Sequence, residues 1–341
     1  MENLLLNNLN KKKTSEVPIW LMRQAGRYMK EYHDIKKKFS SFMEMCKNEE
    51  AISEITLQPI KKFDFDAAII FSDILVILDA LNIDVQFKPG EGPIIKTPKK
   101  DNLVEEIKKE LNYAKLQPCY NAIKNIKKTL ITKPLIGFSA APWTLACYYI
   151  EGKITKDLSI IKKYSYQEIK KTDMLIELLT DHIIDHLKNQ IKAGVDAVQI
   201  FDTHAFQMDF KSHEKYSVNM LKKISKELKL KYPNIPIIFY TKSNLMRYYN
   251  EIGLYVNCLS FNSNIDLAKE KNFINNNICI QGNLDPVLLT VGGREMIDTV
   301  NKILTAMTER PFIFNLGHGV LPGTPIKNVY DLIDCVKKFN S

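Results

Sequence analysis

The 341-residue sequence predicts an α/β protein built as a single (β/α)8 barrel over residues 1–341, with an active-site cleft at the C-terminal ends of the strands. The first observation behind this prediction is a series of eight short apolar runs bounded by turn residues, a pattern typical of parallel strands buried on both faces. The second is that amphipathic helical patterns separate these runs. An open doubly wound sheet gives a similar alternation, but the count of runs favours the barrel. The runs are Val17–Met22, Ala67–Phe71, Leu135–Phe138, Ala197–Phe201, Ile235–Tyr240, Tyr255–Leu259, Ile278–Ile280 and Pro311–Phe314.

The helical pattern is clearest between the third and fourth runs. Residues 169–193 carry apolar side chains at three- and four-residue spacing with lysines on the opposite face, and Gly194 follows as a helix stop. The apolar run that begins at Ala197 comes directly afterwards. A helix, a glycine and a strand in this order form one repeat of a barrel.

Polar side chains follow the strands at one end of the predicted barrel. Because the C-terminal ends of barrel strands form the active-site face, these residues should converge in space. They are Arg23 and Arg27 after the first run, Ser72-Asp73 after the second, Ser139 to Trp143 after the third, Asp202-Thr203-His204 after the fourth, and Asn315 to Gly319 after the last.

Composition excludes several classes of protein. The formal charge of +9 (48 Lys and Arg against 39 Asp and Glu) lies mostly in helix-like stretches, and no basic stripe with interleaved aromatic residues indicates nucleic-acid binding. No apolar run could span a bilayer, and the N-terminal residues are too polar for a signal peptide, so we expect a soluble protein that binds no membrane. Six scattered cysteines without zinc spacing indicate a reducing compartment and no metal, and the common nucleotide-binding loops are absent.

The segment from Pro18 to Tyr28 is the most informative motif. It ends an apolar run in two arginines, Arg23 and Arg27, on either side of Gly26. Guanidinium groups stay charged at physiological pH and offer forked N–H donors, so the pair suits carboxylates or phosphates. The alternative is a surface turn with solvated arginines.

Five segments in order along the chain resemble the uroporphyrinogen decarboxylase family. They are Pro18 to Tyr28, Ile55 to Pro59 leading to Phe71 to Leu75, Gly137 to Gly152, Gln281 to Pro286, and Asn315 to Gly319. The resemblance implies a cofactor-free (β/α)8 homodimer of haem biosynthesis that binds a polycarboxylate tetrapyrrole. Such an enzyme removes the carboxyl groups of four acetate side chains of uroporphyrinogen III to give coproporphyrinogen III. We therefore expect no cofactor.

The resemblance also implies site residues. The catalytic ones would be Asp73, Arg23 and Tyr148; the substrate-binding ones would be Arg23, Gln24, Ala25, Gly26, Arg27, Asp73, Tyr148, Thr203 and His318. The sequence departs from the family pattern at Lys30, Phe206, Ser260 and Phe261, and Phe206 and Phe261 could narrow or reshape part of the cleft.

Each of these residues also has a structural interpretation. Asp73 could accept pyrrole N–H bonds and stabilise a cationic ring, or it could cap a helix. Tyr148 could orient Asp73 or be a core tyrosine, and Thr203 could bind a carboxylate or cap the next helix. His318 at a strand end is expected to bind a carboxylate. Arg23 is a candidate proton donor by resemblance, but with a pKa above about 12 it is better suited to binding and polarisation.

Two other functions stay open. Corrinoid or thiol methyltransferases share the decarboxylase fold and bind zinc through His and Cys, but the strand end with Asn315 and His318 has no nearby cysteine. A basic, non-catalytic protein that binds polyanions is the other alternative. Both cytosol and plastid fit the sequence, the latter if a targeting leader was trimmed.

Overall fold

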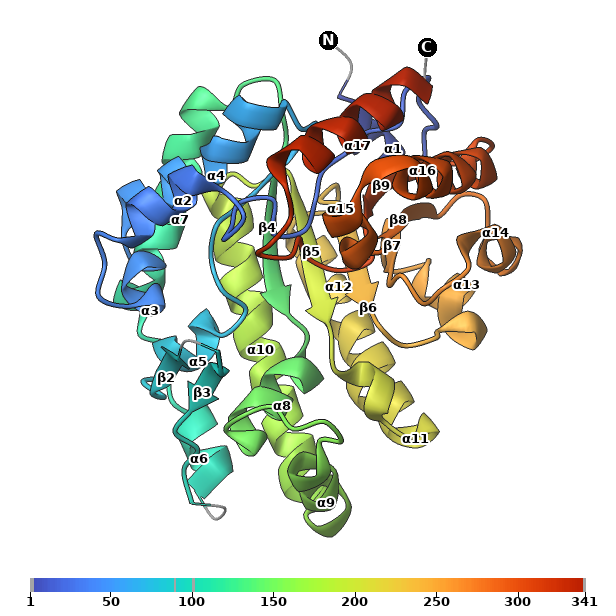
Figure 1. Ribbon diagram of the computed structural model, residues 1–341. Coiled ribbons are helices and arrows are strands. Elements are labelled where there is room, and N and C mark those ends of the chain that lie inside the picture. The colour runs from blue at the N-terminus through green and yellow to red at the C-terminus, as the bar shows by residue number, and fades with distance from the viewer. Residues whose placement is uncertain (1–2, 89, 100–101, 340–341) are drawn as a thin grey trace.

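A computed structural model describes residues 3–88, 90–99 and 102–339. Its centre is a curled seven-stranded sheet in the order β1-β4-β5-β6-β7-β8-β9, with every neighbouring pair parallel (Figure 1). Each strand overlaps one of the last seven predicted runs. The strands are β1 (Ala68–Ile69), β4 (Leu135–Ala140), β5 (Ala197–Asp202), β6 (Ile237–Thr241), β7 (Cys258–Phe261), β8 (Cys279–Leu284) and β9 (Phe312–Leu316).

The first predicted strand, at 17–22, is not a strand. This segment touches β9 through one parallel bridge, Ile19 to Phe314, and on its other side Asp66 N–H donates to the Ile19 carbonyl at 3.0 Å. The ladder ends early because side chains then take over the backbone bonds: Leu21 N–H donates to Gln24 Oε1 and Met22 N–H to Asn315 Oδ1. The segment therefore lies between β9 and the start of β1 without pairing as a regular strand.

Helices surround the sheet (Figure 1). The predicted helix at 169–193 is confirmed as α10, and Gly194 ends it with φ 118°. The helices are α1 (Leu4–Leu9), α2 (Lys30–Lys36), α3 (Phe42–Met45), α4 (Glu49–Phe63), α5 (Val76–Ala80), α6 (Leu103–Ile107), α7 (Tyr113–Thr129), α8 (Pro142–Glu151), α9 (Ser159–Gln167), α10 (Ile169–Ala193), α11 (Phe210–His213), α12 (Asn219–Lys231), α13 (Tyr249–Ile252), α14 (Leu267–Glu270), α15 (Pro286–Val291), α16 (Gly293–Met307) and α17 (Ile326–Phe339).

A small hairpin lies outside the main sheet. Strands β2 (Val85–Lys88) and β3 (Gly92–Ile95) pair in antiparallel register, with Val85 opposite Ile95. Neither strand was predicted from the sequence, because each is four residues long and partly exposed. In Figure 1 the hairpin, α8, α9 and α11 lie at the end towards which the arrowheads of β4, β5 and β6 point, whereas both termini lie at the opposite end.

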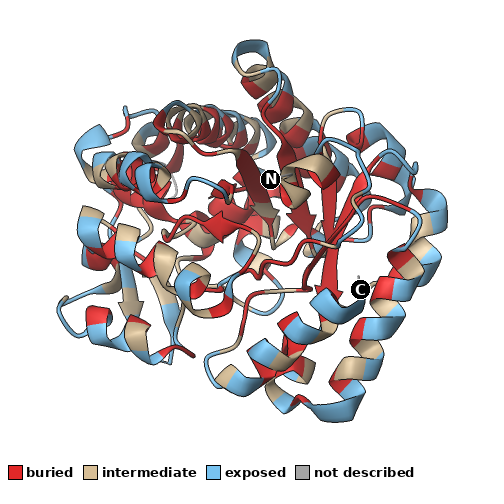
Figure 2. Ribbon diagram, turned by 90° about the horizontal axis from the view of Figure 1, so that it is seen from above, coloured by how far each residue is buried: buried red, intermediate tan, exposed pale blue. Residues whose placement is uncertain are grey.

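Buried residues gather on the strands and on the inner faces of the helices (Figure 2). The sheet also encloses a chain of polar side chains. Trp20 Nε1–H donates to Gln281 Oε1 at 3.0 Å, and Gln281 Nε2–H2 donates to Gln199 Oε1 and Ser260 Oγ at 3.2 and 2.9 Å. These bonds satisfy buried polar groups and fix how the first segment sits against the interior of the sheet. None of the described helices combines the length and apolar character that crossing a membrane requires.

Candidate active site

The loop after the first apolar segment places Arg23 at the C-terminal end of the sheet. Arg23 adopts a left-handed backbone conformation with φ 61°. The preceding residue is held on both sides, because Met22 N–H donates to Asn315 and Val320 N–H donates to the Met22 carbonyl at 2.9 Å. The loop at 315–320 thus fixes the base of Arg23, whose side chain is exposed.

Gln24 supports this loop from inside. It was expected among the substrate-binding residues, but its side chain is fully buried and its amide is occupied: Oε1 accepts from Leu21 N–H and Nε2 donates to the Ala67 carbonyl. Tyr28 Oη–H donates to the Gln24 carbonyl at 2.7 Å. The Gln24 side chain therefore anchors the loop to Ala67, the residue before β1, instead of facing the cleft.

The rest of the motif is more accessible. Ala25 and Gly26 are half-buried, and Arg27 is exposed. The Arg27 carbonyl bonds the His33 imidazole at 2.8 Å, so the backbone is held while the guanidinium extends outward. Within the part of the chain that the structure describes, neither Arg23 nor Arg27 forms an ion pair with a carboxylate. Both cations are available to an anionic ligand.

Asp73 follows β1 and lies half-buried beside Arg23. Its Oδ1 accepts from Leu75 N–H at 2.9 Å, and the N-cap of α5 is Leu75, so Asp73 stabilises a turn and is not itself the helix cap. Burial raises the pKa of Asp73 to about 6, against the opposing effects of the Leu75 hydrogen bond and the positive charge of Arg23. The carboxylate is mostly ionised at neutral pH but titrates close to it.

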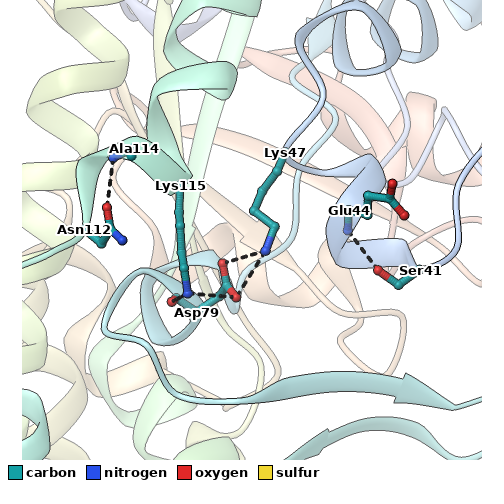
Figure 3. A network of polar contacts seen from close by, with 7 residues as sticks. All are labelled: Ser41, Glu44, Lys47, Asp79, Asn112, Ala114 and Lys115. Atoms are coloured by element: carbon teal, nitrogen blue, oxygen red, sulfur yellow. Dashed lines mark hydrogen bonds and ion pairs between the residues drawn. The ribbon is translucent and has the colours of Figure 1, made fainter.

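A charge network holds α5, the helix that follows Asp73 (Figure 3). The carboxylate of Asp79, on α5, accepts hydrogen bonds from Lys47 at 3.3 and 3.4 Å and from Lys115 at 3.5 Å. Lys115 also donates to the Asp79 carbonyl at 2.7 Å. Lys47 follows α3 and Lys115 lies on α7, so two separate elements tie down α5 through one carboxylate.

Tyr148, on α8, lies close to the same charges. Burial raises the pKa of Tyr148 to about 12; the negative charge of Asp73 adds to this shift and Arg23 opposes it. Tyr148 is therefore a neutral hydroxyl at physiological pH and can donate a hydrogen bond. Its ring meets the edge of His204 with centroids 5.3 Å apart. His204 follows the fourth apolar run but was not predicted as a site residue.

His318 and Lys242 complete the cluster. Burial lowers the pKa of His318 to about 3, and the positive charges of Lys242 and Arg23 act in the same direction. His318 Nδ1 accepts from Gly319 N–H at 2.7 Å. Because a neutral imidazole has one N–H, the hydrogen then lies on Nε2, which can donate to a ligand. Lys242 follows β6 and was missed by the sequence analysis, although it obeys the same strand-end pattern.

Thr203 lies between a buried carboxylate and His204. The neighbouring Asp202 accepts a hydrogen bond from Thr144 Oγ1–H at 3.0 Å and another from Ser217, and burial raises its pKa to about 6. Thr203 is half-buried. His204 is the N-cap residue of the short turn η2 (Ala205–Gln207). Thr203 therefore does not cap the next helical segment.

The departures from the family pattern lie in different places. Ser260 is buried and bonds Gln281 inside the sheet, and Phe261 packs edge-on against Tyr249 at 5.5 Å. The expectation that Phe261 narrows the cleft is wrong, since its ring contacts the core. Phe206 is 49% exposed and lines a cavity of about 950 Å³ that also contains Lys242. Within residues 3–88, 90–99 and 102–339, no group of three or more His, Cys, Asp or Glu side chains is placed to hold a metal ion.

A curled parallel sheet with a carboxylate, an arginine, a lysine, a phenol and a neutral histidine at its C-terminal end defines an α/β enzyme whose site suits an anionic substrate. The family model described as "Uroporphyrinogen decarboxylase (URO-D)" matches residues 1–339. The chain belongs to this family.

Relatives in other organisms agree with this placement, and one solved structure shares the fold. The chain is 39% identical over 337 residues to uroporphyrinogen decarboxylase of Rickettsia bellii, covering 98% of each sequence, and 41% identical over 330 residues to that of Wolbachia pipientis wMel, covering 95% of this chain and 94% of the relative. A methyltransferase from Methanosarcina mazei superposes with a TM-score of 0.78 at 18% identity, over 99% of this chain and 98% of that one. At that identity the likeness concerns the fold alone.

Proposed function

We propose that this enzyme converts uroporphyrinogen III to coproporphyrinogen III by removing the carboxyl groups of four acetate side chains, a step of haem biosynthesis. One observation carries the proposal: in a chain of this family, the half-buried Asp73 carboxylate lies beside Arg23 and Tyr148 at the strand ends. Asp73 matches the central acid expected from the sequence. The substrate would bring pyrrole N–H donors to Asp73 and carboxylates to the arginines.

Asp73 would act on the pyrrole ring as an electrostatic partner. A proton adds to a pyrrole carbon and the ring becomes cationic. The electron pair of the bond between the acetate CH2 and its carboxylate then flows into the ring, and carbon dioxide leaves an exocyclic methylene. A proton adds to the methylene and the first proton leaves the ring carbon, which restores the pyrrole with a methyl group. An ionised carboxylate fixed against the ring stabilises the cation, and in a partly desolvated site this effect is large.

The surrounding residues would bind and orient. Arg23 and Arg27 are exposed cations suited to substrate carboxylates. Tyr148 donates from a neutral hydroxyl, and His318 from Nε2 of a neutral imidazole, to the same kind of acceptor. Thr203 and the half-buried backbone of Ala25 and Gly26 complete the surface that the substrate would meet.

Further parts of the proposal come from family membership. We propose one domain over the whole chain, a closed (β/α)8 barrel in which the segment at 17–22 takes the place of the first strand between β9 and β1, a homodimer, and a reaction that needs no metal or organic cofactor. From the scattered cysteines we also propose a reducing compartment, either cytosol or plastid. Sedimentation at micromolar concentration tests the dimer, since a species of 39.3 kDa would contradict it. If the reaction needs no cofactor, the enzyme should keep full activity after exhaustive chelation and dialysis.

The test of the function is an anaerobic assay with chemically reduced uroporphyrinogen III. Products are oxidised to porphyrins and separated by carboxyl number. We expect seven-, six- and five-carboxylate intermediates to appear and the four-carboxylate product to accumulate, with the Asp73→Asn variant as the control for spontaneous loss. Recovery of the eight-carboxylate compound alone from the native protein would refute the proposal.

A further inference from the structure

A second concave surface adjoins the candidate active site. The cavity of about 950 Å³ lies among the loops that follow β5, β6 and β7. It shares Lys242 with the cluster around Arg23 and His318, but Arg23, Asp73 and Tyr148 do not line it. The cavity is therefore a neighbour of the catalytic cluster with its own walls. We call it the annex and define it by Phe206, Phe210, His213, Lys242, Ser243 and Arg247.

The annex combines cations with aromatic faces. The Arg247 guanidinium lies 4.2 Å from the centroid of the Phe210 ring, and Lys242 Nζ lies 6.0 Å from that of Phe206. The rings of Phe206 and Phe210 are about half exposed, at 49% and 51%. Large aromatic rings are costly to leave in water, and here they line a hollow where a planar ligand could cover them.

The charged residues that line the annex are all basic. The residues that line the annex include Lys242 and Arg247 and no Asp or Glu. Neither cation forms an ion pair with a residue that the structure describes. Cations held over rings without a carboxylate partner keep their full attraction for an incoming anion.

The annex also holds polar atoms that lack a partner. His213 Nε2 and Ser243 Oγ are buried and make no hydrogen bond within the described part of the chain, although each residue is only 8% exposed. Buried polar atoms usually find partners, and a polar ligand in the annex would supply partners for these two. Both atoms belong to residues that line the hollow.

We propose that the annex is a subsite for the outer, carboxylate-bearing edge of the tetrapyrrole whose reacting pyrrole lies at Asp73. Pyrrole rings would cover Phe206 and Phe210, and peripheral carboxylates would bind Lys242 and Arg247. This inference rests on the proposed function for the identity of its ligand. It assigns to Lys242 and Arg247 the role of substrate-binding residues that select for many carboxylates.

The experiment measures binding of uroporphyrin I, an oxidised eight-carboxylate porphyrin that cannot be decarboxylated by this route, through quenching of its fluorescence at low ionic strength. Deuteroporphyrin IX, with two carboxylates, is the comparison ligand. We expect Lys242→Met and Arg247→Met each to raise the dissociation constant for uroporphyrin about five- to tenfold, the scale of one charge-assisted contact at a partly exposed site. In the same two variants the dissociation constant for deuteroporphyrin should rise by less than about twofold.

Matched controls separate the annex from net charge. Lys226→Met removes a lysine that lies 5.5 Å from the Tyr255 ring outside the annex, and Arg294→Met removes an exposed arginine of α16. Both should bind uroporphyrin like the native protein. Phe206→Ser removes one aromatic ring of the annex and leaves every charge in place. This variant should bind both porphyrins more weakly. Thermal midpoints confirm that each variant is folded.

The outcomes distinguish this inference from the proposed function. If the native enzyme decarboxylates uroporphyrinogen but the annex variants bind uroporphyrin as tightly as the two controls, the annex proposal is overturned. If the native protein does not decarboxylate and the annex variants still lose affinity selectively, the annex stands as a polycarboxylate site and the proposed reaction falls.

Discussion

Gly319 lies directly against the aliphatic part of the Arg23 side chain. A Cβ placed on Gly319 would lie 2.3 Å from Arg23 Cδ and 2.6 Å from its Cγ, which is far inside the van der Waals contact distance of two non-bonded carbon atoms. The glycine after His318 therefore makes room for the arginine that reaches the site from the opposite end of the sequence. The two loops fit together only because residue 319 has no side chain.

This contact predicts the effect of Gly319→Ala. Gly319 does not have a positive φ, so alanine adds no backbone strain and the added methyl group must displace Arg23. We expect turnover to fall about ten- to a hundredfold, since misplacing a binding group by about 1 Å has this effect, with little change in thermal midpoint. Gly323→Ala is the control, because a Cβ there meets nothing within 4 Å. Equal turnover in the two variants would contradict the role of the contact.

Arg27→Ala should weaken binding of a polycarboxylate porphyrin in a salt-dependent way. Arg27 is exposed, so its attraction for a carboxylate acts largely through water and is screened over about 10 Å at 0.1 M salt. We expect a severalfold loss of affinity at low ionic strength that shrinks as salt is added. Titration of the native protein and the variant with uroporphyrin I at a series of salt concentrations measures this loss of affinity. An affinity that is unchanged at low salt would remove Arg27 from the site.

Asp79→Ala should lower the free energy of unfolding and also slow the reaction. The substitution leaves Lys47 and Lys115 facing each other without their shared carboxylate, at a position where Asp79 is 9% exposed. We expect a loss of about 1 to 3 kcal/mol in urea unfolding, as for a largely buried pair that loses one partner. Asp34→Ala breaks the exposed pair with Lys37 and should change stability by less than about 0.5 kcal/mol. Similar losses in both variants would count against a supporting role for Asp79.

The sequence predicted the fold through backbone patterns and the site through strand ends. Seven runs became strands because parallel strands buried on both faces must be continuously apolar. The run at 17–22 looked the same in sequence, but the side chains of Gln24 and Asn315 take over its backbone bonds, and a pairing across so many residues leaves no local signal. Position along a strand also cannot show which way a side chain points. Gln24 was expected in the cleft because the family resemblance covers the whole segment from Arg23 to Arg27, but its side chain is buried.

Other site features had a signal that went unused. His204 and Lys242 follow β5 and β6 as Asp73 follows β1, so the strand-end rule covers them too. The anchoring of α5 through Asp79 left no signal in the sequence, because Lys47 and Lys115 come from distant parts of a lysine-rich chain. Charge contacts of this kind depend on tertiary packing alone.

The pKa of Asp73 predicts the acid limb of the activity profile. Burial raises this pKa from 3.8 to about 6, and the proposed mechanism needs the carboxylate, so kcat/KM should rise with pH and be half-maximal near pH 6. Asp202 has a similar pKa for the same reason but bonds Thr144 and Ser217 in the interior. In the Asp202→Asn variant, kcat/KM should therefore still rise with pH and be half-maximal near pH 6. A profile flat from pH 5 to 8 in the native enzyme would contradict the assignment.

The same pKa shift fixes the sign of the Asp73 contribution to stability. Because the folded state holds the proton more tightly than the unfolded chain, this group favours folding fully below about pH 4, and its contribution is lost as pH rises through about 6. At pH 8 the native protein therefore bears the cost of a desolvated carboxylate, and Asp73→Asn removes it. Asparagine also keeps the oxygen that accepts from Leu75 N–H, so the turn before α5 is preserved.

Asp73→Asn should consequently separate catalysis from folding. We expect the chemical step to fall about a hundredfold or more, the scale on which removing one preorganised electrostatic group acts, while uroporphyrin binding suffers less and the thermal midpoint at pH 8 is equal or higher. Asp266→Asn is the matched control: Asp266 accepts from Ala268 N–H two residues ahead, as Asp73 does from Leu75, but on an exposed helix cap. Turnover of that control should stay native. If Asp73→Asn also kept near-normal decarboxylation, the carboxylate would be only a turn-forming group, and the cationic ring would have to be stabilised elsewhere.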